Sequence, residues 1–160
     1  MPLANIIAGP YTASWQSAAV GQSQNGFRLR SSVNKEMVRS DAYGDSAIDG
    51  VWRGGNVMLL FVGIEYTAGL PVFWPYGGAF GLFGQAGTLD VGSTFAQQIS
   101  LTVTSGTPAV GNPTNLSGNQ SILDENFSGE TEFRSGARVL PISMRLYPYV
   151  NSGTRFFTAA

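Results

Sequence analysis

Three aspartates, Asp41, Asp45 and Asp49, recur at every fourth position within the densest polar segment of the chain, residues 39–55. Clustered carboxylates raise the question of calcium, which prefers several oxygen ligands. An EF-hand loop, however, places its acids at alternate positions and ends with a glutamate, so that its ligands converge on one ion. Two glycines within the segment also weaken any helix that could align the wider spacing found here. The segment therefore predicts a long hairpin loop whose acids pair with Arg39 and Arg53 or with a neighbouring subunit.

The composition excludes the common catalytic systems. The 160 residues include no His and no Cys, so no Ser-His-Asp or Cys-His nucleophile, ordinary zinc site or disulfide framework can form. Glu130 and Glu132 share one face of an expected strand, with Asp124 and Glu125 just before it. Glycosidases need two acids across a cleft, one with its pKa raised by burial, whereas paired acids on a solvated strand face are far commoner. We therefore expect no enzyme activity, no catalytic residue, no cofactor and no metal.

Glycines and aromatic residues suggest two further kinds of binding. Gly78, Gly81, Gly84 and Gly87 recur at every third position, but collagen needs many such triplets and a phosphate loop needs a Gly-Lys-Ser/Thr ending. Residues 77–87, which also contain phenylalanines, are interpreted as contact surface. Three tryptophans and six tyrosines can stack on sugar rings. A carbohydrate-binding β-sandwich therefore stays open beside the alternative that these aromatics fill a core or an oligomer interface.

Charge is scarce and unevenly placed. Charged residues make up 12% of the chain, against roughly 25% in an ordinary domain, and Asp90 is the only one between Tyr66 and Leu123. That stretch is too rich in proline and glycine for a membrane-spanning helix, and the N-terminus lacks the cationic start of a signal peptide. Burial against other protein explains the missing charge best. A net charge of −1 argues against a dedicated nucleic-acid binder.

The elements that carry these residues have a period of two. Alternation predicts strands at residues 27–30, 99–104 and Leu140–Leu146, and the apolar run at 57–62 predicts a strand covered on both faces. Flanking strands are expected at residues 10–15 and 154–158. We predict a mainly β fold, an antiparallel sandwich or barrel with one short α-helix, in a single domain over residues 1–160.

Turns and the helix complete this prediction. Turns are expected at residues 21–26, at Tyr43-Gly44-Asp45 and at Gly54-Gly55, and residues 106–118 are interpreted as a long exposed loop. The short helix is expected at residues 67–74, with Thr67 as its N-cap. A further single turn is possible at residues 93–96.

The glycines, acids and strands together form an ordered pattern over nearly the whole chain. Its parts are Gly9-Pro10-Tyr11-Thr12, then Gly21 and Gly26, then Asp41-x-x-Gly44-Asp45-x-x-Ile48-Asp49-Gly50-x-x-x-Gly54 leading into residues 57–65, and the late strand Leu140–Leu146. This pattern resembles the major tail tube protein of long-tailed bacteriophages. The glycine-rich segment at residues 77–87 departs from it.

The resemblance implies a β-sandwich protomer, hexameric rings stacked into a hollow tube, and strands from each protomer in a continuous inner barrel. Residues 39–55 match the loop that reaches the adjacent ring, and residues 1–8 match a terminal arm that does the same. The implied contacts between rings are Asp41, Asp45, Asp49, Trp52, Arg53, Ile6 and Ile7. Asp45 and Asp49 would face cations of the next ring, and Trp52 would be an anchor.

The function implied by the resemblance is physical. A tube that passes DNA must not bind it, because each cation on phosphate adds affinity, and the single lysine, Lys35, with a pI near 5.2, is compatible with that need. The expected partners are further copies of the chain, the terminator, baseplate and tape-measure proteins, and DNA as passing cargo, with no membrane. The protein would be made in the host cytoplasm and act in the virion tail. Alternatives are a connector, a decoration protein, an injection-system inner tube protein or the carbohydrate-binding module.

Overall fold

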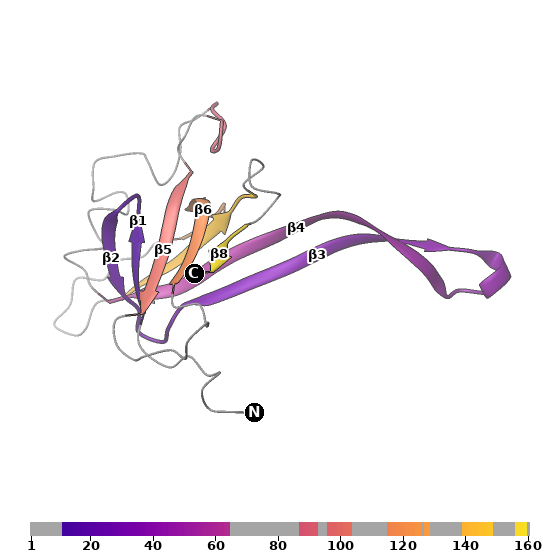
Figure 1. Cartoon of the computed structure of the whole chain (residues 1–160), viewed down its shortest axis with the longest axis horizontal. Helices are drawn as coiled ribbons and strands as arrows, with labels where there is room; N and C mark the ends of the chain where they lie inside the picture. The colour runs from indigo at the N-terminus through magenta and orange to yellow at the C-terminus, as the bar shows by residue number, and fades with distance from the viewer. Residues whose placement is uncertain are drawn as a thin grey trace.

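The chain folds into one antiparallel sheet of eight strands (Figure 1). The computed structural model describes residues 11–64, 87–92, 96–103, 115–125, 127–128, 139–148 and 156–159. In chain order, the elements are β1 (Tyr11–Trp15), β2 (Ala18–Gln22), β3 (Arg28–Arg39), the 3-10 turn η2 (Asp41–Tyr43), β4 (Ala47–Gly63), β5 (Gln97–Val103), β6 (Asn115–Leu123), β7 (Leu140–Leu146) and β8 (Thr158–Ala159). The mainly β class is confirmed. The helix expected at residues 67–74 lies outside the described residues.

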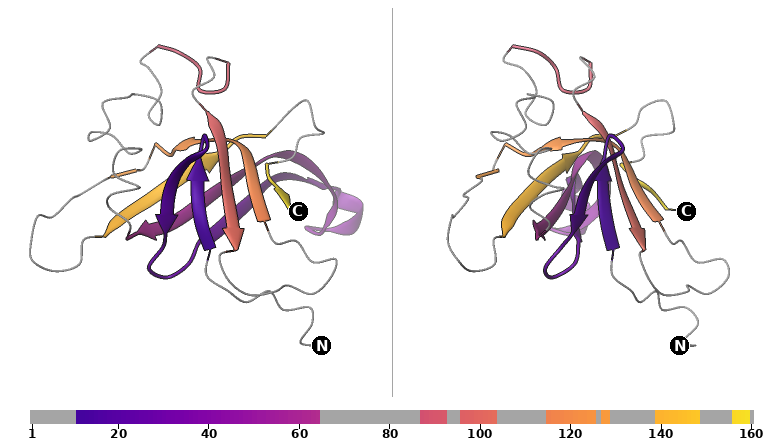
Figure 2. Two further views of the ribbon diagram at one scale, coloured as in Figure 1. Left: turned by 60° about the vertical axis from the view of Figure 1, so that its left-hand side comes forward. Right: turned by 90° about the vertical axis from the view of Figure 1, so that its left-hand side faces the viewer.

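Six of the strands curve into a barrel (Figure 2). The strand order is β2-β1-β5-β6-β7-β4-β3, and β8 pairs with β6. β6 pairs with β5 through its residues 115–121 and with β7 through its residues 121–123. The two strands therefore cover different parts of β6. A bridge between Ser23 and Gly63 joins the end of β2 to the end of β4, and the Gln24 amide donates to the Val62 carbonyl at 2.9 Å. These contacts close the sheet, leaving β3 outside the closure.

Alternate side chains from the barrel strands fill its interior. In β7, Leu140, Ile142, Met144 and Leu146 are all buried, as the alternation predicts. The core cluster also contains Ala13, Trp15, Val20, Val57, Leu59, Phe61, Ile99, Leu101 and Leu123. The Trp15 indole spans this interior, and its Nε1 donates to the Ser121 carbonyl at 3.1 Å.

The strand at residues 57–62 is confirmed, but its two faces differ. Val57, Leu59 and Phe61 are buried in the core, whereas Met58, Leu60 and Val62 are only half-buried. The expectation that both faces are fully covered is therefore wrong for the described residues, because the outer face of β4 has no second layer over it there.

Part of one predicted loop and one predicted turn are strands in the structure. Residues 115–118, expected in a long exposed loop, begin β6. A Cβ at Gly118 would lie 2.5 Å from Leu146 Cδ2, so close packing of β6 on the core requires glycine where alternation would place an apolar residue. Gly54 and Gly55 lie inside β4, where the pairing with β3 shifts register between Asn34 and Lys35. They mark a β-bulge, and Gly54 has a φ of 137°.

Candidate assembly surface

A two-stranded arm extends out of the barrel (Figure 1). β3 and β4 pair along their length, but β7 covers β4 only from Val57 to Gly63. The arm, defined here as residues 32–56, therefore continues as a bare ribbon that ends at η2. Every residue of β3 is exposed, as are residues 47–53 of β4. An isolated two-stranded hairpin is marginally stable in water, and this arm has no stabilising contact with any other described element.

Both edges of the arm are open in the part of the chain that the structure describes. β3 is the last strand of the sheet, so its outer edge pairs with no described strand. Residues 47–56 of β4 pair with β3 on one side and with no described strand on the other. Such edges present rows of unpaired N–H and C=O groups, which are templates for pairing with another chain. In contrast, the barrel strands β1, β5 and β7 each have a neighbour on both sides.

Apolar side chains lie on both faces of the arm. The pairing register puts Val33, Met37 and Trp52 on the face that continues from the core residues of β4; Val33 is 64% exposed and Trp52 is 56% exposed. Val38 and Val51 are exposed on the opposite face. No described element covers either set. A monomer rarely leaves so much contiguous apolar surface in water, and such surface marks an interaction site.

The tip of the arm is built by a short turn. The Ser40 hydroxyl accepts a hydrogen bond from the Ala42 amide at 3.4 Å, and this caps η2. Gly44 ends η2 with a φ of 66°, a conformation that favours glycine. The predicted turn at Tyr43-Gly44-Asp45 is confirmed, and Tyr43 at its centre is 69% exposed. Ile48, at the start of β4, is exposed beside it.

Charges are separated along the arm. The tip carries Asp41, Asp45 and Asp49, and Arg28 and Arg30 lie at the base, where the arm leaves the barrel. Arg39 Nη1 and Asp45 Oδ1 are 3.5 Å apart, which confirms one predicted ion pair. The described acids near η2 are too few and too separated to form a metal-binding group, and none is found among the described residues.

Arg53 has a different partner from the loop acids expected for it, and Asp49 pairs with no described cation. Arg53 does not pair with the loop acids: its Nε donates to Glu36 Oε2 at 2.7 Å, across the ribbon. Asp49 Oδ1 accepts from the Gly50 amide at 2.7 Å. Within the described chain, neither Asp41 nor Asp49 forms an ion pair. These two carboxylates are therefore available to a cation outside the described residues.

The structure brings most of the predicted contact residues together. All five loop candidates lie on the arm: Asp41, Asp45 and Asp49 at or near its tip, and Trp52 and Arg53 nearer the barrel, opposite Asn34 and Lys35. The element is a strand pair and not a long loop, because residues 47–55 belong to β4. The other two candidates, Ile6 and Ile7, lie outside the described residues.

The sequence interpretation missed part of this surface. Arg28, Arg30, Val33 and Met37 belong to it, and the alternation at residues 27–30 marks only the base of the strand that carries them. The predicted acids Glu130 and Glu132 lie outside the described residues, as does most of the segment 77–87.

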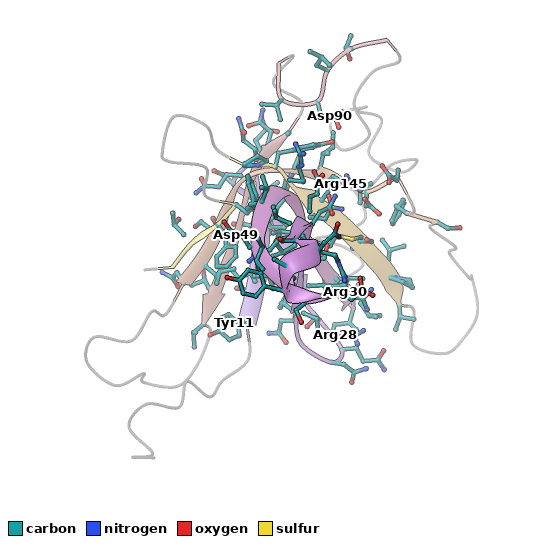
Figure 3. The ribbon with its side chains drawn as sticks, turned by 90° about the vertical axis from the view of Figure 1, so that its right-hand side faces the viewer. Tyr11, Arg28, Arg30, Asp49, Asp90 and Arg145 are labelled. Carbon is teal, nitrogen blue, oxygen red and sulfur yellow. The ribbon has the colours of Figure 1, made fainter. Side chains whose placement is uncertain are left out.

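A second polar cluster lies on the barrel, where Arg145 joins two acids (Figure 3). Arg145 Nε donates to the buried Asp124 Oδ1 at 3.0 Å, and its Nη2 donates to Glu125 Oε1 at 3.1 Å. Burial opposes the guanidinium charge, but the hydrogen bond to Asp124 and the charge of Glu125 raise the pKa of Arg145. Asp124 and Glu125 are thus both bound to the same arginine.

Beside this cluster, Tyr147 is tied to Asp90. The Tyr147 hydroxyl donates to Asp90 Oδ2 at 2.7 Å. Partial burial, together with this hydrogen bond, raises the pKa of Tyr147 to about 12. The Tyr147 hydroxyl therefore keeps its proton near neutral pH. The arrangement of Tyr147 and Asp90 stabilises the end of β7 and offers no reactive group.

Comparison with known proteins adds no relative. No protein-family model matches the chain, and no curated protein sequence matches it either. Among the described residues, the structure has no helix of the length and apolar character that crossing a bilayer requires. The functional argument therefore depends on the arm and on the chain's own chemistry.

Proposed function

We propose that the protein is a structural component that assembles with copies of itself into stacked rings, forming the tail tube of a long-tailed bacteriophage. The observation that carries this proposal is the arm: a ribbon with two open edges and exposed apolar side chains on both faces. Self-association satisfies both features at once. The resemblance in glycines, acids and strands noted above supplies the identity of the assembly.

The two edges of the arm are complementary to one another. β3 runs toward the tip and β4 runs back from it. When arms of neighbouring copies point the same way, β3 of one copy lies antiparallel to β4 of the next. Open N–H and C=O groups then pair between copies, and each copy uses a different edge for each neighbour. Such a heterologous contact produces a ring when the rotation closes.

The tube would serve as the conduit for DNA ejection. Its partners would be the terminator, baseplate and tape-measure proteins, with DNA as passing cargo, and it would be made in the host cytoplasm before assembly into the virion. One lysine in the chain and an overall charge of −1 support this role, because a conduit with few cations retains little DNA.

Sedimentation velocity and negative-stain microscopy of the purified protein test the proposal. Rings or hollow tubes are the expected result, with the fraction assembled rising with protein concentration. A protein that stays monomeric at high concentration and binds a glycan array would favour the carbohydrate-binding alternative and overturn the proposal.

A further inference from the structure

A hollow beside the base of the arm has the chemistry to receive the arm's tip. It is lined by Arg28, Leu29, Arg30, Ser31 and Leu60, with a volume of about 530 Å³. A second hollow of about 240 Å³ shares Arg28 and Leu60 with it and extends over β7. The apolar lining of the two hollows, which includes Leu60, Phe61 and Ile142, is called here the apolar floor. Arg28 and Arg30 line the first hollow and supply two guanidinium groups.

Polar groups in these hollows lack partners of their own. Arg28 and Arg30 form no ion pair within the described part of the chain. The Ser143 hydroxyl, which lines the second hollow, is buried and has no hydrogen-bond partner among the residues that the structure describes. The exposed Arg28 and Arg30 attract anions, and the buried hydroxyl beside them lacks the partner that buried polar groups normally have, so the two together favour an anionic ligand.

The tip of the arm matches this surface in charge and in apolar character. Asp41 and Asp49 supply carboxylates without an ion pair in the described chain, and Tyr43 supplies an exposed aromatic ring. Carboxylates bind arginine by charge-assisted hydrogen bonds, and an aromatic ring suits the apolar floor. Within one copy the tip cannot reach this surface, because the eleven steps from Arg28 to Arg39 along β3 span about 36 Å at the rise of an extended strand.

Resting on the proposed function, we propose that the tip of each arm docks into the Arg28–Arg30 hollow of a copy in the next ring. Asp41 and Asp49 then face Arg28 and Arg30, and Tyr43 covers the apolar floor. Viewed from the tip, Figure 3 shows Arg28 and Arg30 on one side of the arm and Asp49 on the other. The receiving copy is therefore turned as well as shifted along the arm, by about one arm length of 36 Å. This contact joins different surfaces of two copies and shifts each copy along the arm, so it repeats without closing.

Charge reversal tests this contact. The base variant Arg28→Glu/Arg30→Glu and the tip variant Asp41→Arg/Asp49→Arg each place like charges together. We expect each alone to raise the concentration needed for stacking at least about tenfold. When separately assembled rings of the two variants are mixed in equal amounts, they should stack near the wild-type concentration, because each tip meets a base of opposite charge when the two kinds of ring alternate. Lys35→Glu is the matched control. Lys35 pairs with Trp52 and so lies on the strand face opposite to that of Arg28 and Arg30; this variant should stack like the wild type.

A cross-link provides a second measurement that does not depend on charge reversal. The chain has no cysteine, so Arg30→Cys/Asp49→Cys introduces the only two thiols. Oxidation of the stacked protein should give a ladder of covalent multimers, whereas Lys35→Cys/Asp49→Cys should give none.

The outcomes separate the contact from the assembly. If the wild type stacks and the charge-reversed variants stack unchanged, the docking proposal is wrong and the tube proposal stands. The same holds if the wild type stacks and Arg30→Cys/Asp49→Cys gives no ladder. A wild type that forms no rings or stacks would overturn both. Circular dichroism of each variant establishes that a loss of stacking is not a loss of fold.

Discussion

Shortening the arm should abolish assembly and leave the barrel folded. In the variant we consider, residues 34–54 are replaced by Asn-Gly, which closes a tight hairpin at the paired residues Val33 and Gly55. The replaced stretch contributes no residue to the hydrophobic core. The free energy of unfolding should therefore change by no more than about 1 kcal/mol, as for surface changes away from packed features.

The expected effect on assembly is much larger. The replaced stretch carries six exposed large apolar side chains: Met37, Val38, Tyr43, Ile48, Val51 and Trp52. Each is roughly half exposed, so its burial between copies stabilises the assembly by about 1 kcal/mol, half of the value for a fully exposed side chain. The six together contribute about 6 kcal/mol, or about four powers of ten in the association constant. Sedimentation velocity should show only monomer at concentrations where the wild type is fully assembled.

A polar arm of full length is the matched control. Val38→Thr/Val51→Thr keeps shape and strand propensity while removing apolar contact, so its assembly threshold should lie between those of the wild type and the shortened variant. Two results would refute the reasoning. Assembly of the shortened variant at the wild-type threshold would mean that the arm is not the contact, and its failure to fold would mean that the arm supports the barrel.

Three further predictions concern the barrel and are checked by urea denaturation. Met144→Ala should lower the free energy of unfolding by about 2–5 kcal/mol, because Met144 is fully buried in the core; a loss below 1 kcal/mol would contradict that packing. Gly118→Ala should cost about 1–3 kcal/mol, since the added methyl group would lie 2.5 Å from Leu146 Cδ2, and no loss would mean that β6 shifts freely. The pKa of Tyr147 is raised from 10.0 to about 12. The protonated hydroxyl therefore contributes in full to the free energy of unfolding below pH 10, and this contribution is lost as the pH rises toward 12. Tyr147→Phe should therefore show less alkaline loss over that window than the wild type, and parallel pH curves would contradict this.

The barrel strands differ in how clearly the sequence indicates them. β7 alternates because one of its faces is in the core, so its apolar positions were predicted correctly. β6 has no such pattern, because Gly118 occupies an inward position where Leu146 and Ile99 leave no room for a side chain. The tight turn before β2 was also missed. Gln16 and Ser17 both have positive φ there, and neither is a residue type that signals such a turn.

The arm illustrates a different limit. Residues 31–38 show no period of two, because neither face of the ribbon packs on a core within the chain. Alternation reports burial on one face, so a strand pair without that burial is invisible to it. The contact residues at the tip could be proposed from acids, glycines and Trp52. The hollow at the base could not, because Arg28 and Leu60 meet only through the pairing of β3 with β4.

The arm and its base carry much of the chain's charge, unlike the charge-poor stretch between Tyr66 and Leu123. Nine of the charged residues lie between Arg28 and Arg53, on the element that extends furthest into solvent. Its internal ion pairs, Arg39 with Asp45 and Arg53 with Glu36, are exposed, and exposed pairs contribute about 0–1 kcal/mol each. They cannot hold a bare ribbon of this length against its conformational entropy. On the proposed function, the open edges, the exposed valines and the unpaired tip carboxylates find their partners in another copy, and those contacts hold the ribbon in place.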